Sequence, residues 1–411
     1  MERISRFRAI LLLILFITIL ALFAVKLFDL QIIETNGNTD NIAKYTTVTT
    51  VRAARGDILD RNGNKLVGNR ASYNLVFNHY VIESYGQTNE ALYSLVQKCR
   101  ELNLSYNDHF PVSKTRPFEY TLNDFATSWQ NHFQSFMVDR SLDSDITAPL
   151  LIEKLRGRYK IPEGWSDEDA RAVIGMRYEF DLRGISKLPT YTFIQDISDE
   201  NLSAILELNI PGLMVESSTV REYHTKYAAH ILGYMGGMDD DDWEKYQKEG
   251  YSMDAYIGQS GFEEAFEDYL HGIDGQRVDV VSKDGTIVEQ FWRVNQKTGE
   301  VYTPIAGNNV ETTIDLELQG IAEDSLASIM KELTDPEKNT SKDESNGLDA
   351  EGAAVIVMKV KTGEILACAS YPTYNLATMN QDWAEIEADP LKPFFNRAFG
   401  ANYAPGSTFK M

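Results

Sequence analysis

The sequence predicts a multi-domain α+β protein with an N-terminal transmembrane helix. Three observations support this: a long apolar run near the start, strand-like alternation from Tyr45, and an amphipathic helix with a hairpin after Asn308. A chain of 411 residues is long enough for two or three domains, each with its own core. We therefore expect an anchor, a mixed α/β domain and a further domain.

The anchor is predicted within residues 1–30. Three arginines among the first eight residues precede the apolar run Ala9–Val25, which Lys26 closes. The run is at the short end for a membrane span, and it has no polar face, which disfavours the alternative of a buried core helix. Positive charge before the span predicts a cytoplasmic N-terminus, with the bulk of the chain on the extracytoplasmic side of the membrane.

Composition excludes several classes of function. The chain has 39 Lys and Arg against 61 Asp and Glu, a net charge of −22, whereas nucleic-acid binding needs a basic surface. The two cysteines, Cys99 and Cys368, are far apart, and there is no CxxC pair or HExxH spacing. We expect no nucleic-acid partner, no metal and no cofactor.

The segment after the anchor has strand signals. Thr46–Val51 and Tyr73–Phe77 alternate between apolar and polar residues. Between them, Asn62-Gly63 predicts a two-residue hairpin loop of type I′, in which both residues need positive φ.

The middle of the chain, Glu83–Asn209, is expected to mix helix and loop, and no chemistry is evident in it. Ala91–Leu102 and Ser198–Leu208 are plausible amphipathic helices. The acidic run Asp239–Asp242 could bind a cation, but its spacing does not match a calcium loop, so a helix cap is the favoured interpretation. Gly258–Leu270 is predicted to be one helix.

A third composition begins near Asn308. The pattern predicts an amphipathic helix over Leu316–Leu333, a buried strand over Ala353–Val360, a turn at Lys361–Glu364 and a partner strand over Ile365–Ser370.

The sharpest candidate for chemistry is Ser407, which follows Pro405-Gly406 and precedes Lys410. Pro-Gly would open a helix on which Ser407 and Lys410 lie one turn apart on one face. A serine needs a base within hydrogen-bond reach, and a lysine can be that base when its pKa is lowered. We therefore expect Ser407 to be a nucleophile and Lys410 its base.

Other short motifs are expected to be structural. Ser328-Ile329-Met330-Lys331 repeats the Ser-x-x-Lys spacing inside an amphipathic helix without a Pro-Gly start. Lys297-Thr298-Gly299 and Lys361-Thr362-Gly363 are both followed by glutamate in turn contexts.

Four ordered segments resemble class B penicillin-binding proteins. They are Arg55–Gly63; Arg221–Tyr223 with Ala228–Tyr234; Gly258–Glu263 with Glu267, Leu270, Gly272 and Gly275; and Thr312–Gln319, Gly352–Pro372 and Asn396–Ala398 running into Pro405–Lys410. One departure is His224, where relatives commonly carry proline.

The resemblance implies an elongated mixed α/β pedestal of the dimerisation type over 31–307 and the beginning of an α/β transpeptidase domain over 308–411. It implies a peptidoglycan D,D-transpeptidase of the bacterial cell membrane, in which Ser407 is acylated by stem peptides or β-lactams and Lys410 takes its proton. It also implies a polytopic glycan polymerase and other cell-wall synthesis proteins as partners.

The Ser-x-Asn and Lys-Thr-Gly motifs that such enzymes carry after the nucleophile do not follow Ser407 in this sequence, and both Lys-Thr-Gly triplets named above precede it. We therefore expect a truncated record of a larger protein, and an inactive chain when taken alone. The alternative is a non-catalytic, membrane-anchored scaffold of cell-wall synthesis; a β-lactam sensor is disfavoured by the single short anchor.

Overall fold

The computed structural model describes Phe16, Thr18, Phe23 and residues 45–403, apart from 187, 189, 252–254, 283–286 and 342–345. The predicted anchor lies almost wholly outside these residues. Among the residues described, no helix is long and apolar enough to cross a membrane. The chain divides into a smaller unit, which holds Val278–Phe291 and the residues up to Thr47, and a larger unit with the remainder.

The larger unit is built on a five-stranded sheet around one long strand, β3. From Val67 to its end at Phe77, β3 pairs antiparallel with β5, and it also pairs with β2 and β4; β10 then adds parallel to β2. The strands are β2 (Ile58–Leu59), β3 (Lys65–Phe77), β4 (Tyr191–Ile197), β5 (Leu213–Tyr223) and β10 (Val310–Glu311). The β2–β10 pairing places the start of the C-terminal segment, which begins near Asn308, directly beside Arg55–Gly63, the first motif of the resemblance.

Three smaller sheets complete the strand structure. They are β1 (Tyr45–Val51), β8 (Gly275–Val281) and β9 (Ile287–Trp292) in the order β1-β8-β9; β6 (Met235–Gly237) with β7 (Tyr256–Gly258); and β11 (Ala353–Met358) with β12 (Ile365–Tyr371). Within the smaller unit, the Gln290 amide donates to the buried Asp279 carboxylate at 2.9 Å. The strand predicted over Thr46–Val51 is confirmed as β1.

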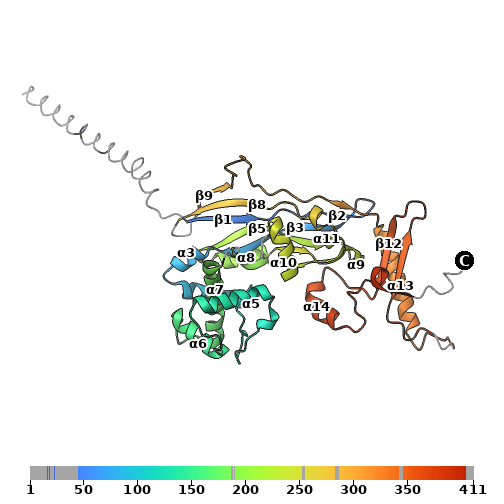
Figure 1. Ribbon diagram of the computed structural model, residues 1–411, viewed down its shortest axis with the longest axis horizontal. Helices are drawn as coiled ribbons and strands as arrows, with labels where there is room; N and C mark the ends of the chain where they lie inside the picture. Colours follow the sequence, from blue (N-terminus) through green and yellow to red (C-terminus); the bar gives the residue numbers. More distant parts are fainter. Residues whose placement is uncertain are drawn as a thin grey trace, which may run out of the picture. The chain divides into compact units, whose positions relative to one another are not determined.

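Six α-helices in the described part of the range 79–206 form a helical module (Figure 1). Together with β4 they enclose the largest apolar core of the described residues. The helices are α3 (His79–Ser84), α4 (Thr88–Glu101), α5 (Thr127–Asp139), α6 (Ala148–Arg158), α7 (Asp167–Ile185) and α8 (Asp199–Leu206). The central helix, α7, packs against α3, α4, α5, α6 and β4, and most of its residues are buried. The predicted helices over Ala91–Leu102 and Ser198–Leu208 are confirmed as α4 and α8, within two or three residues at each end.

The first predicted hairpin is present, but its turn differs from the expected type. Gly63 has φ of +82°, whereas Asn62 does not have positive φ, so the loop is not type I′. The buried Asp60 carboxylate accepts hydrogen bonds from the backbone N–H groups of Asn62 and Asn64, each at 2.8 Å. These side-chain contacts hold a wider loop, and β2 pairs with β3 through a bulge.

The predicted helix over Gly258–Leu270 is wrong as a single element. The segment begins in β7, and the helix is broken at Phe266 into α11 (Gly261–Ala265) and α12 (Glu267–Leu270). Phe266 has φ of −114° and ψ of 22°, outside the α region. Glu263 of α11 and Glu267 of α12, the two acidic residues on either side of the break, are both buried.

The acidic run is a helix cap, as expected. Asp239 precedes α10 (Asp240–Tyr246), and its carboxylate accepts from the Asp242 N–H at 2.8 Å while the Asp242 side chain accepts from the Asp239 N–H. In the described part of the chain, no cluster of residues could hold a metal ion. A short helix, α9 (Ala229–Leu232), lies just before this region.

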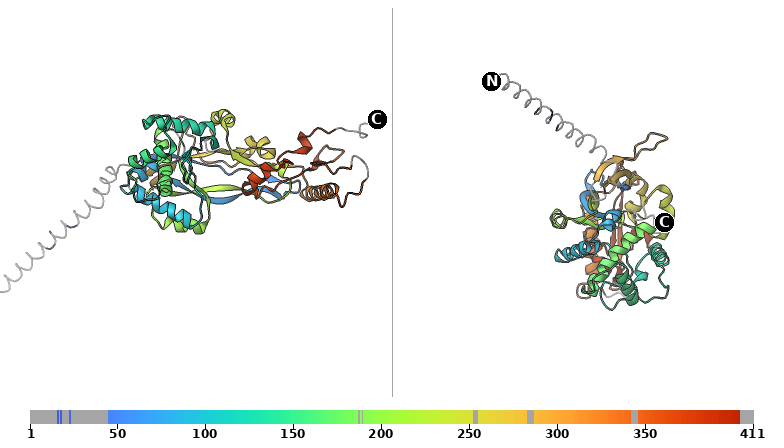
Figure 2. Two further views of the ribbon diagram at one scale, coloured as in Figure 1. Left: turned by 90° about the horizontal axis from the view of Figure 1, so that it is seen from below. Right: turned by 90° about the vertical axis from the view of Figure 1, so that its left-hand side faces the viewer.

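The C-terminal segment, from about Asn308 onward, contains α13 (Leu316–Leu333) and the β11–β12 hairpin. The predicted bounds of α13 are confirmed. Figures 1 and 2 show α13 along the hairpin, and its apolar side packs on Ala367 and Ala369. The strand expected to be buried is exposed on its other face, where Ile356 is 47% and Met358 is 53% exposed. Two further helices, α14 (Met379–Ala388) and α15 (Arg397–Gly400), follow the hairpin.

The core of the helical module gives a direct test of the fold. Phe136 on α5 is fully buried, and its ring meets Tyr178 edge to face at a centroid distance of 4.8 Å. We expect Phe136→Ala to lower the free energy of unfolding by about 3–5 kcal/mol, because a large cavity replaces the ring. Val138→Ala on the same helix, where the side chain is 79% exposed, is the control and should change it by less than about 0.5 kcal/mol in urea unfolding.

Candidate functional site

The predicted catalytic pair, Ser407 and Lys410, lies outside the described residues. The structure describes the segment that leads to this pair. It also describes the contact between the three N-terminal motifs, which are Arg55–Gly63, Arg221–Tyr234 and Gly258–Gly275. Chance matches to the catalytic motif are placed clearly: Ser328 and Lys331 are exposed on α13, and the two Lys-Thr-Gly triplets are turns. The predicted placements of these motifs, on a helix and in two turns, are confirmed.

The segment that approaches Ser407 is fixed by Arg397, the first residue of α15. Its guanidinium donates to the carbonyl of Leu391 at 2.5 Å, and its backbone N–H donates to the Ser370 hydroxyl on β12 at 3.0 Å. Gly352 lies under the guanidinium, since a Cβ there would come within 2.0 Å of Arg397 Nε. The segment is therefore held against the hairpin by a buried arginine for which only glycine leaves room.

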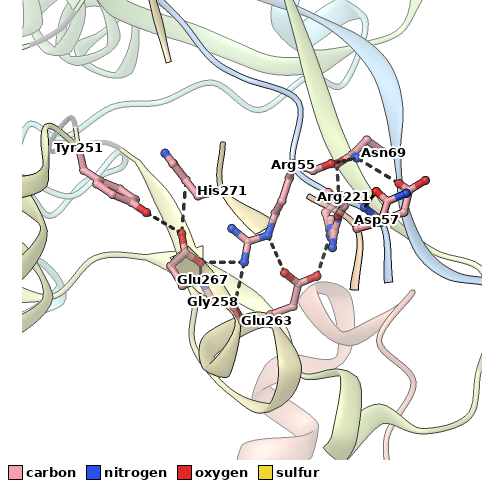
Figure 3. A network of polar contacts seen from close by, with 11 residues as sticks. Arg55, Asp57, Asn69, Arg221, Tyr251, Gly258, Glu263, Glu267 and His271 are labelled. Atoms are coloured by element: carbon pink, nitrogen blue, oxygen red, sulfur yellow. Dashed lines mark hydrogen bonds and ion pairs between the residues drawn. The ribbon is translucent and has the colours of Figure 1, made fainter. Parts of the chain in front are cut away.

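The three N-terminal motifs meet at the carboxylate of Glu263 (Figure 3). Arg55 Nε, from the first motif, lies 2.7 Å from Glu263 Oε2, and Arg221 Nε, from the second, lies 2.7 Å from Glu263 Oε1. Glu263 is fully buried, and both guanidinium groups are nearly so. Each carboxylate oxygen thus has its own arginine, the arrangement that a buried charge requires.

A second carboxylate, Glu267, completes the network. Its Oε2 is 2.7 Å from Arg55 Nη2 and accepts from the Gly258 N–H at 2.9 Å; Oε1 accepts from the Tyr251 hydroxyl at 3.2 Å and lies 3.3 Å from His271 Nδ1. Burial favours the neutral acid, but the hydrogen bond from His271 and the ion pair with Arg55 outweigh it. Together they lower the pKa of Glu267 to about 2.

Backbone contacts tie the arginines to the sheet. Arg221 Nη1 donates to the carbonyl of Gly56 at 2.7 Å, and the Asn69 amide donates to the carbonyl of Arg55 at 2.5 Å. Asn69 and Arg221 face each other across the β3–β5 pairing. The first motif is therefore held by side chains from two neighbouring strands.

Two glycines permit the close approach of the motifs. A Cβ on Gly56 would lie 1.8 Å from the carbonyl oxygen of Asn308, and one on Gly258 would lie 2.1 Å from the carbonyl of Glu263. Neither contact could be relieved by a side-chain movement, because the opposing atoms belong to the backbone. The glycines of the first and third motifs are thus explained by packing.

The sequence singled out Arg55, Arg221, Glu263 and Glu267 as motif residues, and the structure brings all four together. It did not identify Asn69, Tyr251 or His271, which lie outside the motifs and carry no local signal. The two arginines of the network are neutralised by its two glutamates, and none of these four residues is a nucleophile. We therefore interpret the network as a structural joint between the motifs.

Breaking the central ion pair should be costly. We expect Glu263→Ala to lower the free energy of unfolding by about 3–5 kcal/mol, because two buried guanidinium groups lose a partner. Glu264→Ala, at the exposed neighbouring position of α11, is the matched control and should cost less than about 0.5 kcal/mol. Equal effects of the two substitutions in denaturant unfolding would contradict the importance of the network.

The pKa of Glu267 predicts how stability depends on pH. Since this pKa falls from 4.5 to about 2 on folding, the stabilisation is complete above pH 4.5 and is lost as the pH falls towards 2. We expect a contribution of about 3 kcal/mol at neutral pH, and wild type and Glu267→Gln should converge in stability over that window. Glu264→Gln should follow the wild-type pH profile; a Glu267→Gln profile parallel to wild type would refute the assignment.

Comparison with known proteins agrees with the motifs. A family model described as the penicillin-binding protein dimerisation domain matches residues 50–312, and one described as the penicillin-binding protein transpeptidase domain matches 353–411. The peptidoglycan D,D-transpeptidase MrdA of Escherichia coli K12 is 30% identical over 217 residues, which cover 50% of this chain and 30% of that protein.

MrdA of Haemophilus influenzae is 26% identical over 296 residues, covering 66% of this chain and 41% of that protein. The chain thus spans less than half the length of these curated relatives. A solved complex between penicillin-binding protein PBP2 and MreC from Helicobacter pylori matches with a TM-score of 0.46 and 17% identity, covering 86% of this chain and 49% of that one. Since the dimerisation-domain model alone spans more than half of the sequence and its motifs converge in one buried network, the chain belongs to the penicillin-binding proteins.

Proposed function

We propose that this chain belongs to a peptidoglycan D,D-transpeptidase of class B, anchored in the bacterial cell membrane by the apolar run Ala9–Val25. The observation that carries the proposal is the transpeptidase-domain match over 353–411, which ends in Ser407-x-x-Lys410 preceded by Pro-Gly. The names of the relatives, peptidoglycan D,D-transpeptidases, agree with it.

In the proposed reaction, Lys410 takes the proton of Ser407 as the serine oxygen attacks the carbonyl between the two terminal D-alanines of a stem peptide. The peptide bond breaks as Lys410 passes this proton to the departing nitrogen, so the terminal D-alanine leaves as the free amine and an acyl-serine ester remains. An acceptor amine from a neighbouring stem peptide then attacks this ester, which forms the cross-link and releases Ser407. A β-lactam would acylate the same oxygen through its strained ring amide.

The described residues suit a supporting role in this reaction. Arg397 and Ser370 hold the approach to Ser407 against β12, and the Asn396 amide donates to the carbonyl of His230 at 3.4 Å. The pedestal would then carry the catalytic domain away from the membrane. A polytopic glycan polymerase and other proteins of cell-wall synthesis are its proposed partners.

Fluorescent-penicillin labelling of membranes from the source cell tests the proposal, with an antibody to the pedestal identifying the band. We expect the antibody-reactive band to be labelled, and Ser407→Ala to abolish the label because the acyl acceptor is lost. Lys410→Ala should slow acylation by about 10²-fold or more, since it removes the base.

Ser328→Ala is the matched control, because it removes the serine of the exposed Ser-x-x-Lys on α13. Labelling that survives Ser407→Ala would overturn the site assignment. An antibody-reactive band that is never labelled would contradict the transpeptidase proposal and favour the alternative of a non-catalytic scaffold.

A further inference from the structure

Helix α13 lies in the sequence between the two ranges that match family models, 50–312 and 353–411. It contacts the first range through Tyr227 and Ala228 and the second through β11 and β12. Gln319 and Glu323 stand one turn apart on the same face of this helix. Gln319 is fully buried and Glu323 is 9% exposed. Two large polar side chains on an inward face need internal partners, because water cannot replace them.

The two side chains find partners in two separate segments, one at Ala228 and one on β12. Glu323 Oε1 accepts from the backbone N–H of Ala228 at 2.6 Å and from the Gln319 amide at 2.7 Å. The same Gln319 amide donates to the carbonyl of Cys368 at 2.9 Å, and Gln319 Oε1 accepts from the Cys368 N–H at 2.6 Å. We call Ala228, Glu323, Gln319 and Cys368 the α13 relay.

A single atom joins the two halves of the relay. Glu323 Oε1 accepts from both the Ala228 N–H and the Gln319 amide, and the Gln319 amide in turn bonds to Cys368. The Ala228 backbone is therefore linked to β12 through one carboxylate oxygen and one side-chain amide. The two backbone groups of Cys368 also fix which end of the Gln319 side chain is oxygen. The bond from the Cys368 N–H to Gln319 Oε1 and the bond from the Gln319 amide to Glu323 run head to tail, an arrangement in which buried hydrogen bonds strengthen one another.

Neighbouring contacts hold the pedestal segment in register with α13. The ring of Tyr227 lies over Gly320, where a Cβ would come within 2.9 Å of it, and the Tyr227 hydroxyl donates to Asp324 at 2.9 Å. Gly320, Glu323 and Asp324 therefore form one cradle for Tyr227 and Ala228. Registry of this kind keeps the Ala228 N–H aimed at Glu323.

Ala228 itself is in an unfavourable backbone conformation. Its φ of 63° and ψ of 23° are left-handed, which costs an alanine free energy unless its surroundings hold it. Ala228 is also the N-cap residue of α9, which carries His230, the residue that contacts Asn396. Loss of the Glu323 contact would let this segment relax.

We propose that the α13 relay couples the range 50–312, through Ala228, to the β11–β12 hairpin, through Cys368. The hydrogen bond at Ala228 and those at Cys368 then form and open together. The inference stands apart from the proposed function, because its readout is the opening of backbone hydrogen bonds and not transpeptidation. Glu323 and Gln319 are positioning residues in this sense, and they touch no reacting atom.

Amide hydrogen exchange of the full chain, measured on peptides that contain Ala228 or Cys368, tests the coupling. We expect Glu323→Ala to speed exchange of the Cys368 peptide by about tenfold, although Glu323 bonds to Ala228 and Gln319 and not to β12. Gln319→Ala should likewise speed exchange of the Ala228 peptide. Effects confined to the directly bonded peptide in both variants would overturn the proposal.

Two further variants separate coupling from general damage. Glu323→Gln keeps an oxygen for both donors and should restore near wild-type exchange at both peptides. Glu332→Gln, at an exposed position of α13, should change neither peptide. Protection of the α7 amides from exchange reports whether the variant is folded. If the alanine variants lose this protection, Glu323→Asp is measured instead. Unchanged exchange of the Cys368 peptide in Glu323→Asp would then refute the relay.

Discussion

The carboxylate of Glu263 is the group on which the arrangement of the larger unit depends. It is fully buried, and a buried charge is tolerated only when its partners are in place. Those partners, Arg55 and Arg221, come from segments 208 and 42 residues away. The three motifs must therefore assemble together, and the register of β3 against β5, which sets Asn69 opposite Arg221, is compatible with that requirement.

Elements governed by local signals could be predicted closely from the sequence. The bounds of α13 agree because its apolar period is clear and Asp315 caps its first turn, and the acidic run at Asp239 is a cap for the same reason. The segment Gly258–Leu270 was wrong as one helix because tertiary ion pairs, not local propensity, set its geometry. The loop at Gly63 differs because Asp60 supplies side-chain hydrogen bonds that replace a tight turn.

The candidate site divides along the same line. Motif residues such as Arg55 and Glu263 could be picked out, but their mutual contacts depend on the chain folding back over long distances. Tyr251 and His271 carry no local pattern and could not have been found. The exposure of Ile356 and Met358 was also missed, because an apolar run does not reveal which of its faces is covered. Ser407 and Lys410 remain a prediction.

The side chain of Gln319 has a further consequence for the small hairpin sheet. The Gln319 side chain hydrogen-bonds to both the N–H and the carbonyl of Cys368, as a neighbouring strand would. The Thr313 hydroxyl donates to the carbonyl of Ile365 at 2.6 Å, and the Asp315 N–H donates to the carbonyl of Leu366 at 2.8 Å. These contacts close the edge of β12 to any other strand. In the described part of the chain β11 pairs with β12 alone, so a larger sheet can grow only from the β11 side, and edge-to-edge association of two molecules through β12 is blocked.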